Sequence, residues 1–190
     1  MRDLDIRNAL KKELASLHDE ETIILDELGL CQGAARVDLA VVNGALHGYE
    51  IKSERDTLAR LPTQQGIYNK VFDRVTLVIS QSHVEKANQA VPNWWGIAIA
   101  TQTEGHVSVR TVREATDNPL VDAFAQTQLL WREEALTALE ERALAGGLRS
   151  KPKKVLWNRL VTELPPREIG TIVRECLRAR AARPTAEPRE

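Results

Sequence analysis

Hydrophobic and polar positions along the first two thirds of the chain recur in periods that alternate between those of helices and strands. Ile6, Leu10, Leu14 and Leu17 lie at helical spacing, which predicts an amphipathic helix over residues 3–18. The other elements predicted in this part are strands at 22–28, 36–42 and 45–53, a helix at 57–72, a strand at 75–80, a helix at 83–90, and strands at 95–101 and 106–112. The pattern therefore predicts an α/β fold that begins with the order αβββαβ.

The last third of the chain shows helical patterns only, beginning after the turn signal Asp117-Asn118-Pro119. Helices are expected at 120–145, 151–164 and 166–181, where they are separated by glycine and proline pairs. We therefore predict three parts, which are an α/β domain at 1–117, a helical basic region at 118–183 and a disordered tail at 184–190.

The turn signal Asn43-Gly44 predicts a hairpin between the second and third strands. With a two-residue turn, the side chain of Asp38 would point away from that of Glu50. One more residue in the connection would pair Ala40 with Gly48 and place Asp38 opposite Glu50. A site built from both acids therefore requires a three-residue loop or a β-bulge, and we predict one.

Three residue types on these two strands suggest metal chemistry. Asp38 and Glu50, with the carbonyl oxygen of Ile51, supply hard oxygen ligands suited to Mg²⁺. Lys52 projects from the same strand face as Glu50 and could activate water or stabilise negative charge on a phosphate. The alternative is a cluster of salt bridges on a solvated face of the sheet, since this spacing alone is weakly specific.

Composition narrows the class of protein. The chain is 43% hydrophobic and 28% charged, which is typical of a soluble globular protein. It contains no apolar run of the ~20 residues that a membrane span needs, and the N-terminal residues do not resemble a signal peptide. Cys31 and Cys176 are expected to be reduced thiols, so we predict a cytoplasmic protein without a membrane partner.

Charge is distributed unevenly, although the formal net charge is only −1. Residues 1–141 hold 14 Lys+Arg and 22 Asp+Glu, whereas residues 142–183 hold 11 and 3. A basic segment that follows an acidic body favours contact with a polyanion, because neutralised phosphates release their counterions. Alternatively, these charges only solvate the surface of the helices.

The order of elements and four short motifs together resemble the PD-(D/E)XK, or restriction-endonuclease-like, nuclease superfamily, in particular an uncharacterised bacterial branch. The resemblance covers about residues 5–80, with a mixed central sheet, and Val37 stands where the superfamily's name has proline. The matching motifs are Arg36–Asp38, Gly48–Ser53, Asp56–Pro62 and Gln64–Tyr68.

The resemblance implies a role for each matching residue. Asp38 and Glu50 match metal ligands and Lys52 matches the catalytic lysine, with Mg²⁺ or Mn²⁺ as the cofactor. Gln64 and Tyr68 match a pair found beside the active site in some members, and their i, i+4 spacing places them on one helical face. Otherwise they are a cap or a half-buried surface pair.

An additional acid is expected from the first helix or strand. Glu27 is our first choice for this metal ligand and Glu13 is the second, and either could instead be structural.

Nucleic-acid contacts are expected at five basic positions. Each of them could instead pair with an acid or remain solvated. They are Arg36, Arg60, Lys151, Lys153 and Lys154.

Two functions follow as expectations. The first is a Mg²⁺- or Mn²⁺-dependent deoxyribonuclease that hydrolyses phosphodiester bonds in DNA of unspecified form. The alternative is a catalytically weak or inactive module of the same fold that binds nucleic acid or a protein partner. A homodimer through the C-terminal helices is a further expectation.

Overall fold

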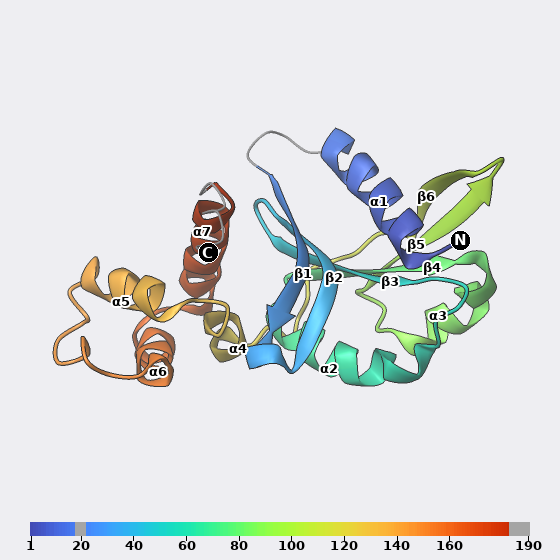
Figure 1. Cartoon of the computed structure of the whole chain (residues 1–190). Helices are drawn as coiled ribbons and strands as arrows, with labels where there is room; N and C mark the ends of the chain where they lie inside the picture. The colour runs from blue at the N-terminus through green and yellow to red at the C-terminus, as the bar shows by residue number, and fades with distance from the viewer. Residues whose placement is uncertain (18–21, 183–190) are drawn as a thin grey trace, which may run out of the picture. The chain divides into compact units, whose positions relative to one another are not determined.

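The computed structural model describes residues 1–17 and 22–182, which belong to two compact units (Figure 1). Unit 1 is Met1–Val121 and unit 2 is Asp122–Glu190, and each is described by itself. The tail predicted at 184–190 lies outside the described residues. The division into a domain at 1–117 and a helical region at 118–183 stays a prediction.

Unit 1 has the mixed α/β composition predicted from the sequence. Its helices and strands are α1 (Asp3–Leu17), β1 (Ile23–Leu30), β2 (Ala35–Val42), β3 (Leu46–Lys52), α2 (Leu61–Val71), β4 (Arg74–Ser80), α3 (Val84–Ala90), β5 (Gly96–Thr103) and β6 (His106–Arg113). Short 3₁₀ turns at Cys31–Gly33, Leu58–Arg60 and Gln81–His83 lead into β2, α2 and α3.

The six strands form one mixed sheet in the order β1-β2-β3-β4-β5-β6. The pairs β3–β4 and β4–β5 are parallel, and the other neighbouring pairs are antiparallel. Parallel neighbours need a crossover connection, which α2 and α3 supply. Figure 1 shows α1 on one face of the sheet and both crossover helices on the other.

Helix α1 closes the core on its own face of the sheet. Its buried side chains Ile6, Leu10 and Leu14 pack against a cluster that includes Tyr49 and Ile51 of β3. These are three of the four apolar positions whose helical spacing predicted α1. The fourth, Leu17 at the end of the helix, is 69% exposed and does not join the core. The amphipathic pattern therefore predicted both the helix and the face that it buries.

The hairpin between β2 and β3 has the predicted register. Ala40 pairs with Gly48 and Val42 pairs with Leu46, which leaves residues 43–45 as a three-residue loop. Within this loop, the backbone N–H of residue 45 donates to Oδ1 of residue 43 at 3.0 Å. The Asn side chain thus stabilises the longer connection, and the prediction of a three-residue loop is confirmed.

Unit 2 contains four helices among its described residues: α4 (Ala123–Thr127), α5 (Arg132–Glu140), α6 (Lys153–Glu163) and α7 (Pro166–Ala181). The prediction of one helix over 120–145 is wrong, because two separate helix starts lie within that range. Asp122 accepts hydrogen bonds from the backbone of residues 124 and 125, and the Trp131 N–H donates to Glu134 at 2.7 Å. Both are N-terminal capping contacts, which apolar periodicity does not reveal.

A glycine on β3 permits Phe72, the residue that follows α2, to pack closely against the sheet. A Cβ atom added at Gly48 would lie 2.8 Å from ring atoms of the fully buried Phe72. We expect Gly48→Ala to lower the free energy of unfolding by about 1–3 kcal/mol in urea denaturation, because the ring has no free space to occupy. Gly44→Ala is the control, since a Cβ there meets nothing within 4 Å. Equal stabilities of the two variants would contradict the prediction.

Candidate functional site

The paired ladder between β2 and β3 stops one position short of Asp38, and the side chain of Asp38 provides the next contact between the strands. Its Oδ2 accepts a hydrogen bond from the backbone N–H of Ile51 at 2.7 Å. Its Oδ1 accepts one from Nη2 of Arg7 at 3.1 Å. Burial, together with the neighbouring charge of Glu50, raises the pKa of Asp38 to about 7, although both hydrogen-bond donors oppose the shift.

The carboxylate of Glu50 is buried and receives hydrogen bonds from three side chains. Lys52 Nζ lies 2.5 Å from Oε1, and Nε2 of Gln64 lies 2.6 Å from the same oxygen. The Tyr68 hydroxyl lies 2.6 Å from Oε2 and 2.8 Å from the carbonyl oxygen of Arg36. Burial and the Glu50 charge raise the pKa of Tyr68, so its phenol stays protonated and able to donate.

Simple local rules place these groups together. Side chains two residues apart on a strand share a face, which puts Glu50 beside Lys52. Residues four apart on a helix share a face, which directs Gln64 and Tyr68 of α2 toward the same carboxylate. With Asp38, all five residues that the sequence singled out for catalysis meet in one buried polar cluster, which we call the Glu50 cluster.

Arg7 of α1 is a member of this region that the sequence did not reveal. Its guanidinium lies 3.2 Å from Asp3, 3.1 Å from Asp38 and in hydrogen-bond contact with Glu27. Glu27, where the β1–β2 ladder is interrupted, also faces the exposed guanidinium of Arg36 at 3.6 Å. No sequence spacing links position 7 to residues 20 or 31 places further along, so only the folded chain shows the contact.

Within unit 1, Glu13 and Arg60 are not members of the Glu50 cluster. Glu13 lines a separate cavity of about 260 Å³ with His47 and Tyr49, and burial raises its pKa. Arg60 is exposed immediately before α2. Lys151, Lys153 and Lys154 are exposed in unit 2. The predicted contacts of Arg36 and Arg60 with nucleic acid stay predictions.

The donor set around the two acids does not suit a divalent cation. Each carboxylate oxygen of Asp38 and Glu50 already accepts a hydrogen bond from a protein group, and two of the donors are cationic. Over residues 1–17 and 22–182, no group of three or more His, Cys, Asp or Glu residues could hold a metal ion. An ion would have to displace Arg7 or Lys52, so binding of Mg²⁺ or Mn²⁺ here stays a prediction without support from the donor set.

Calorimetry tests the site for metal directly. We expect a titration with Mn²⁺ to give the same heat with the wild-type protein and with Asp38→Ala, because protein donors occupy the carboxylates. Circular dichroism of both proteins verifies that the variant is folded. A heat that vanishes in Asp38→Ala would show that these acids hold the ion after all.

The pair Lys52–Glu50 is expected to be stabilising only as a pair. Lys52→Met leaves a buried carboxylate without its cation, and we expect a loss of about 3–5 kcal/mol in the free energy of unfolding by urea. The double variant Lys52→Met/Glu50→Gln should lose less than the sum of the single variants. Arg74→Met, which breaks the more exposed Arg74–Asp117 pair, should cost less than about 1 kcal/mol. A loss from Lys52→Met as small as that from Arg74→Met would contradict this interpretation.

Comparison with known proteins assigns the chain elsewhere than the nuclease superfamily. A family model described as bacteriophage P4 protein cII matches residues 3–185. The curated relative protein cII of Enterobacteria phage P4 is 25% identical over 146 residues, which cover 74% of this chain and 54% of the relative. The chain therefore spans about half the length of the curated relative that it matches. No solved structure matches this chain.

These findings correct the sequence-based identification. The match extends through both units, whereas the nuclease resemblance rested on short motifs within residues 5–80. Recognition as a PD-(D/E)XK nuclease is therefore wrong, and so is the expectation of a hydrolytic deoxyribonuclease. The physical reason is that protein groups donate hydrogen bonds to both acids, as a structural polar cluster also requires, so these residue types do not by themselves indicate catalysis.

Proposed function

The chain belongs to the bacteriophage P4 protein cII family, and we propose that it is a non-catalytic module that binds DNA through unit 2. The observation that carries the proposal is a group of three lysines at the start of α6. Lys151, Lys153 and Lys154 are all exposed, and none has an acidic partner in the described part of the chain.

Five of the eight arginines among the described residues of unit 2 form ion pairs within the unit. The ion pairs are Arg132–Glu133, Arg142–Glu168, Arg149–Glu140, Arg159–Glu163 and Arg180–Glu134. An excess of positive charge in the sequence therefore does not by itself identify a binding surface. The lysine group concentrates three exposed charges within four positions of sequence, which supports a contact with phosphate there.

The start of α6 adds to the attraction for an anion. The residue preceding the helix is Pro152, which provides no side-chain cap, and the first turn contains no acidic residue. The positive end of the helix dipole therefore acts together with the lysine charges. Lys153 lies over the ring of Trp157, with Nζ 5.1 Å from the ring centroid. This contact holds one ammonium group close to the helix terminus.

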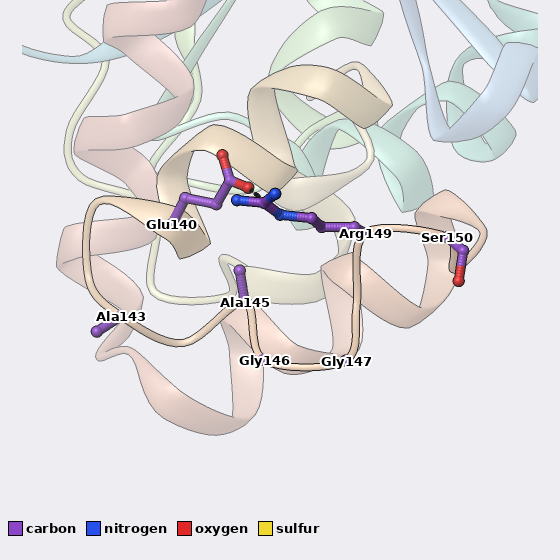
Figure 2. A pocket seen from close by; sticks show the side chains of 7 residues that line it. All are labelled: Glu140, Ala143, Ala145, Gly146, Gly147, Arg149 and Ser150. Carbon is purple, nitrogen blue, oxygen red and sulfur yellow. Dashed lines mark ion pairs between the residues drawn. The ribbon is translucent and has the colours of Figure 1, made fainter.

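The loop before α6 is fixed by side-chain contacts. Arg132 donates to the carbonyl oxygens of Arg149 and Lys151. Figure 2 shows Arg149 reaching across a cavity of about 510 Å³ toward Glu140, with which it forms an ion pair at 2.9 Å. Because the loop is held at both points, the lysines at its end are presented from a defined backbone position, which lowers the entropic cost of binding.

Unit 1 is the scaffold in this proposal. Its order of elements, α1-β1-β2-β3-α2-β4, supports a restriction-endonuclease-like arrangement of the core, here without hydrolytic activity. The Glu50 cluster holds β2, β3 and α2 together rather than acting on a substrate.

Salt-dependent DNA binding tests the proposal. Fluorescence anisotropy would compare the full-length wild type with Lys151→Gln/Lys153→Gln/Lys154→Gln on labelled duplex and single-stranded DNA from 50 to 200 mM salt. We expect weaker binding by the variant. On duplex DNA its salt slope should be smaller by about 0.9 for each phosphate that it no longer neutralises.

The control variant changes the same amount of charge elsewhere. Lys12→Gln/Lys70→Gln/Lys86→Gln removes three exposed lysines of unit 1, and it should bind DNA like the wild type. Equal weakening of both triple variants would show non-specific attraction to net charge and would contradict binding through unit 2. Absence of DNA binding by the wild type would contradict the proposed function itself.

A further inference from the structure

Helices α5 and α7 are antiparallel and are joined at both ends by ion pairs. Glu134 in the first turn of α5 contacts Arg180 in the last turn of α7, with Nε 2.6 Å from Oε1. Arg142, just after α5, contacts Glu168 in the first turn of α7 at 2.6 Å. These two pairs fix the separation of the helices and frame the space between them.

Between the two ion pairs the facing side chains are mostly small. Ala138 of α5 lies near Cys176 and Ala179 of α7, and Ile172 forms part of the apolar floor. The result is a groove of about 350 Å³ within unit 2, which we call the α5–α7 groove. Its volume falls in the range of about 300–1,000 Å³ that is typical of ligand pockets. The groove can therefore accept large apolar side chains from a partner.

An exposed aromatic side chain lies at one end of the groove. Trp131 is 57% exposed, although its indole ring is among the largest apolar groups that a protein can bury. The Arg180 guanidinium covers one side of the ring, with Cζ 4.2 Å from the ring centroid, and Glu134 holds that guanidinium in place. Trp131 is thus fixed before any partner arrives, as expected of an anchor residue at an interface.

The rim of the groove is acidic. Glu133 and Glu141 line it with side chains that are 76% and 66% exposed, and each has an arginine partner: Arg132 lies 2.5 Å from Glu133, and Arg142 lies 3.7 Å from Glu141. Glu175 adds a further exposed carboxylate on α7. Its basic lining residue, Arg142, is engaged by Glu168. This charge repels nucleic acid, and a two-fold contact with a second copy would bring identical acidic rims together.

We propose that the α5–α7 groove binds a basic amphipathic helix of a protein partner. The apolar side chains of that helix fill the space above Ala138 and Ala179 and pack against Trp131, while its Lys and Arg side chains meet the glutamates of the rim. The lining along α5 extends from residue 131, just before the helix, to residue 142, just after it, a length of about 16 Å at 1.5 Å per residue. A partner helix of three turns matches that length. The proposal goes beyond DNA binding and does not depend on it.

Two matched peptides probe the groove. Each is a labelled 16-residue amphipathic helix with leucines at positions i, i+3, i+4 and i+7, and the polar face is lysine in one peptide and glutamate in the other. Anisotropy titrations would use the full-length protein. We expect the lysine peptide to bind and the glutamate peptide to bind at least about ten-fold more weakly.

Variants assign the binding to the groove. Trp131→Ala should weaken binding of the lysine peptide about thirty-fold, as truncation of an anchor residue does. Glu175→Lys should weaken that peptide about three-fold and strengthen the glutamate peptide, because it reverses charge at the rim. Glu85→Lys is the matched control. It makes the same charge change on exposed α3 of unit 1 and should leave both affinities unchanged.

Several outcomes would overturn the proposal. These are equal affinity for the two peptides, equal effects of Glu175→Lys and Glu85→Lys, or no binding by a folded wild type. Circular dichroism identifies any variant that fails to fold. Ala179→Leu, which fills the groove without changing charge, then replaces that variant, and it should also weaken binding of the lysine peptide. Sedimentation that shows a dimer in the wild type but not in Trp131→Ala would mean that the occupant is a second copy, which also contradicts the proposal.

Discussion

The buried carboxylate of Glu50 imposes the central requirement on unit 1. It is 2% exposed, so its charge must be compensated by groups of the protein rather than by water. Lys52 comes from the same strand, whereas Gln64 and Tyr68 come from α2, and Tyr68 also lies against a backbone carbonyl of β2. Satisfying this one carboxylate therefore fixes the position of the crossover helix against two strands. The helix can shift only by breaking hydrogen bonds to a buried charge, which costs more than breaking a surface contact.

Much of this arrangement follows from local sequence rules. Alternation along β3 places Glu50 and Lys52 on one face, and the requirement that the apolar residues share the other face selects the register in which Ala40 pairs with Gly48. The same reasoning fails in residues 120–145, where apolar periodicity continues but the chain begins a new helix at Arg132. That break depends on whether Glu134 bonds back to the N–H of Trp131. A single side-chain hydrogen bond of this kind is not encoded in the spacing of apolar residues.

The function of the cluster could not be read from its residue types. Two acids, a lysine, a glutamine and a tyrosine can hold a metal ion and water, or they can satisfy one another. Which occurs depends on donors remote in sequence, above all Arg7, which reaches Asp38 from α1. The Ile51 N–H adds a bond that the sequence could have anticipated only once the ladder was known to stop short of Asp38. The family match identifies the chain more specifically than the motifs do, because it extends from residue 3 to residue 185, whereas the motifs cover four short segments.

Unit 2 shows why net charge alone is a poor guide to a partner. Its arginines are largely consumed by glutamates of the same unit, and two of these pairs hold α5 against α7 instead of facing a ligand. The unit also carries a lysine group at the start of α6 and a row of glutamates along the α5–α7 groove. Opposite charges kept at separate places favour different partners, because a phosphate chain attracted to the lysines is repelled by the glutamates. The ion pairs formed on folding thus convert a helical unit that is basic in sequence into one with two surfaces of opposite sign. Such a unit would contact nucleic acid and a basic protein segment without competition between them.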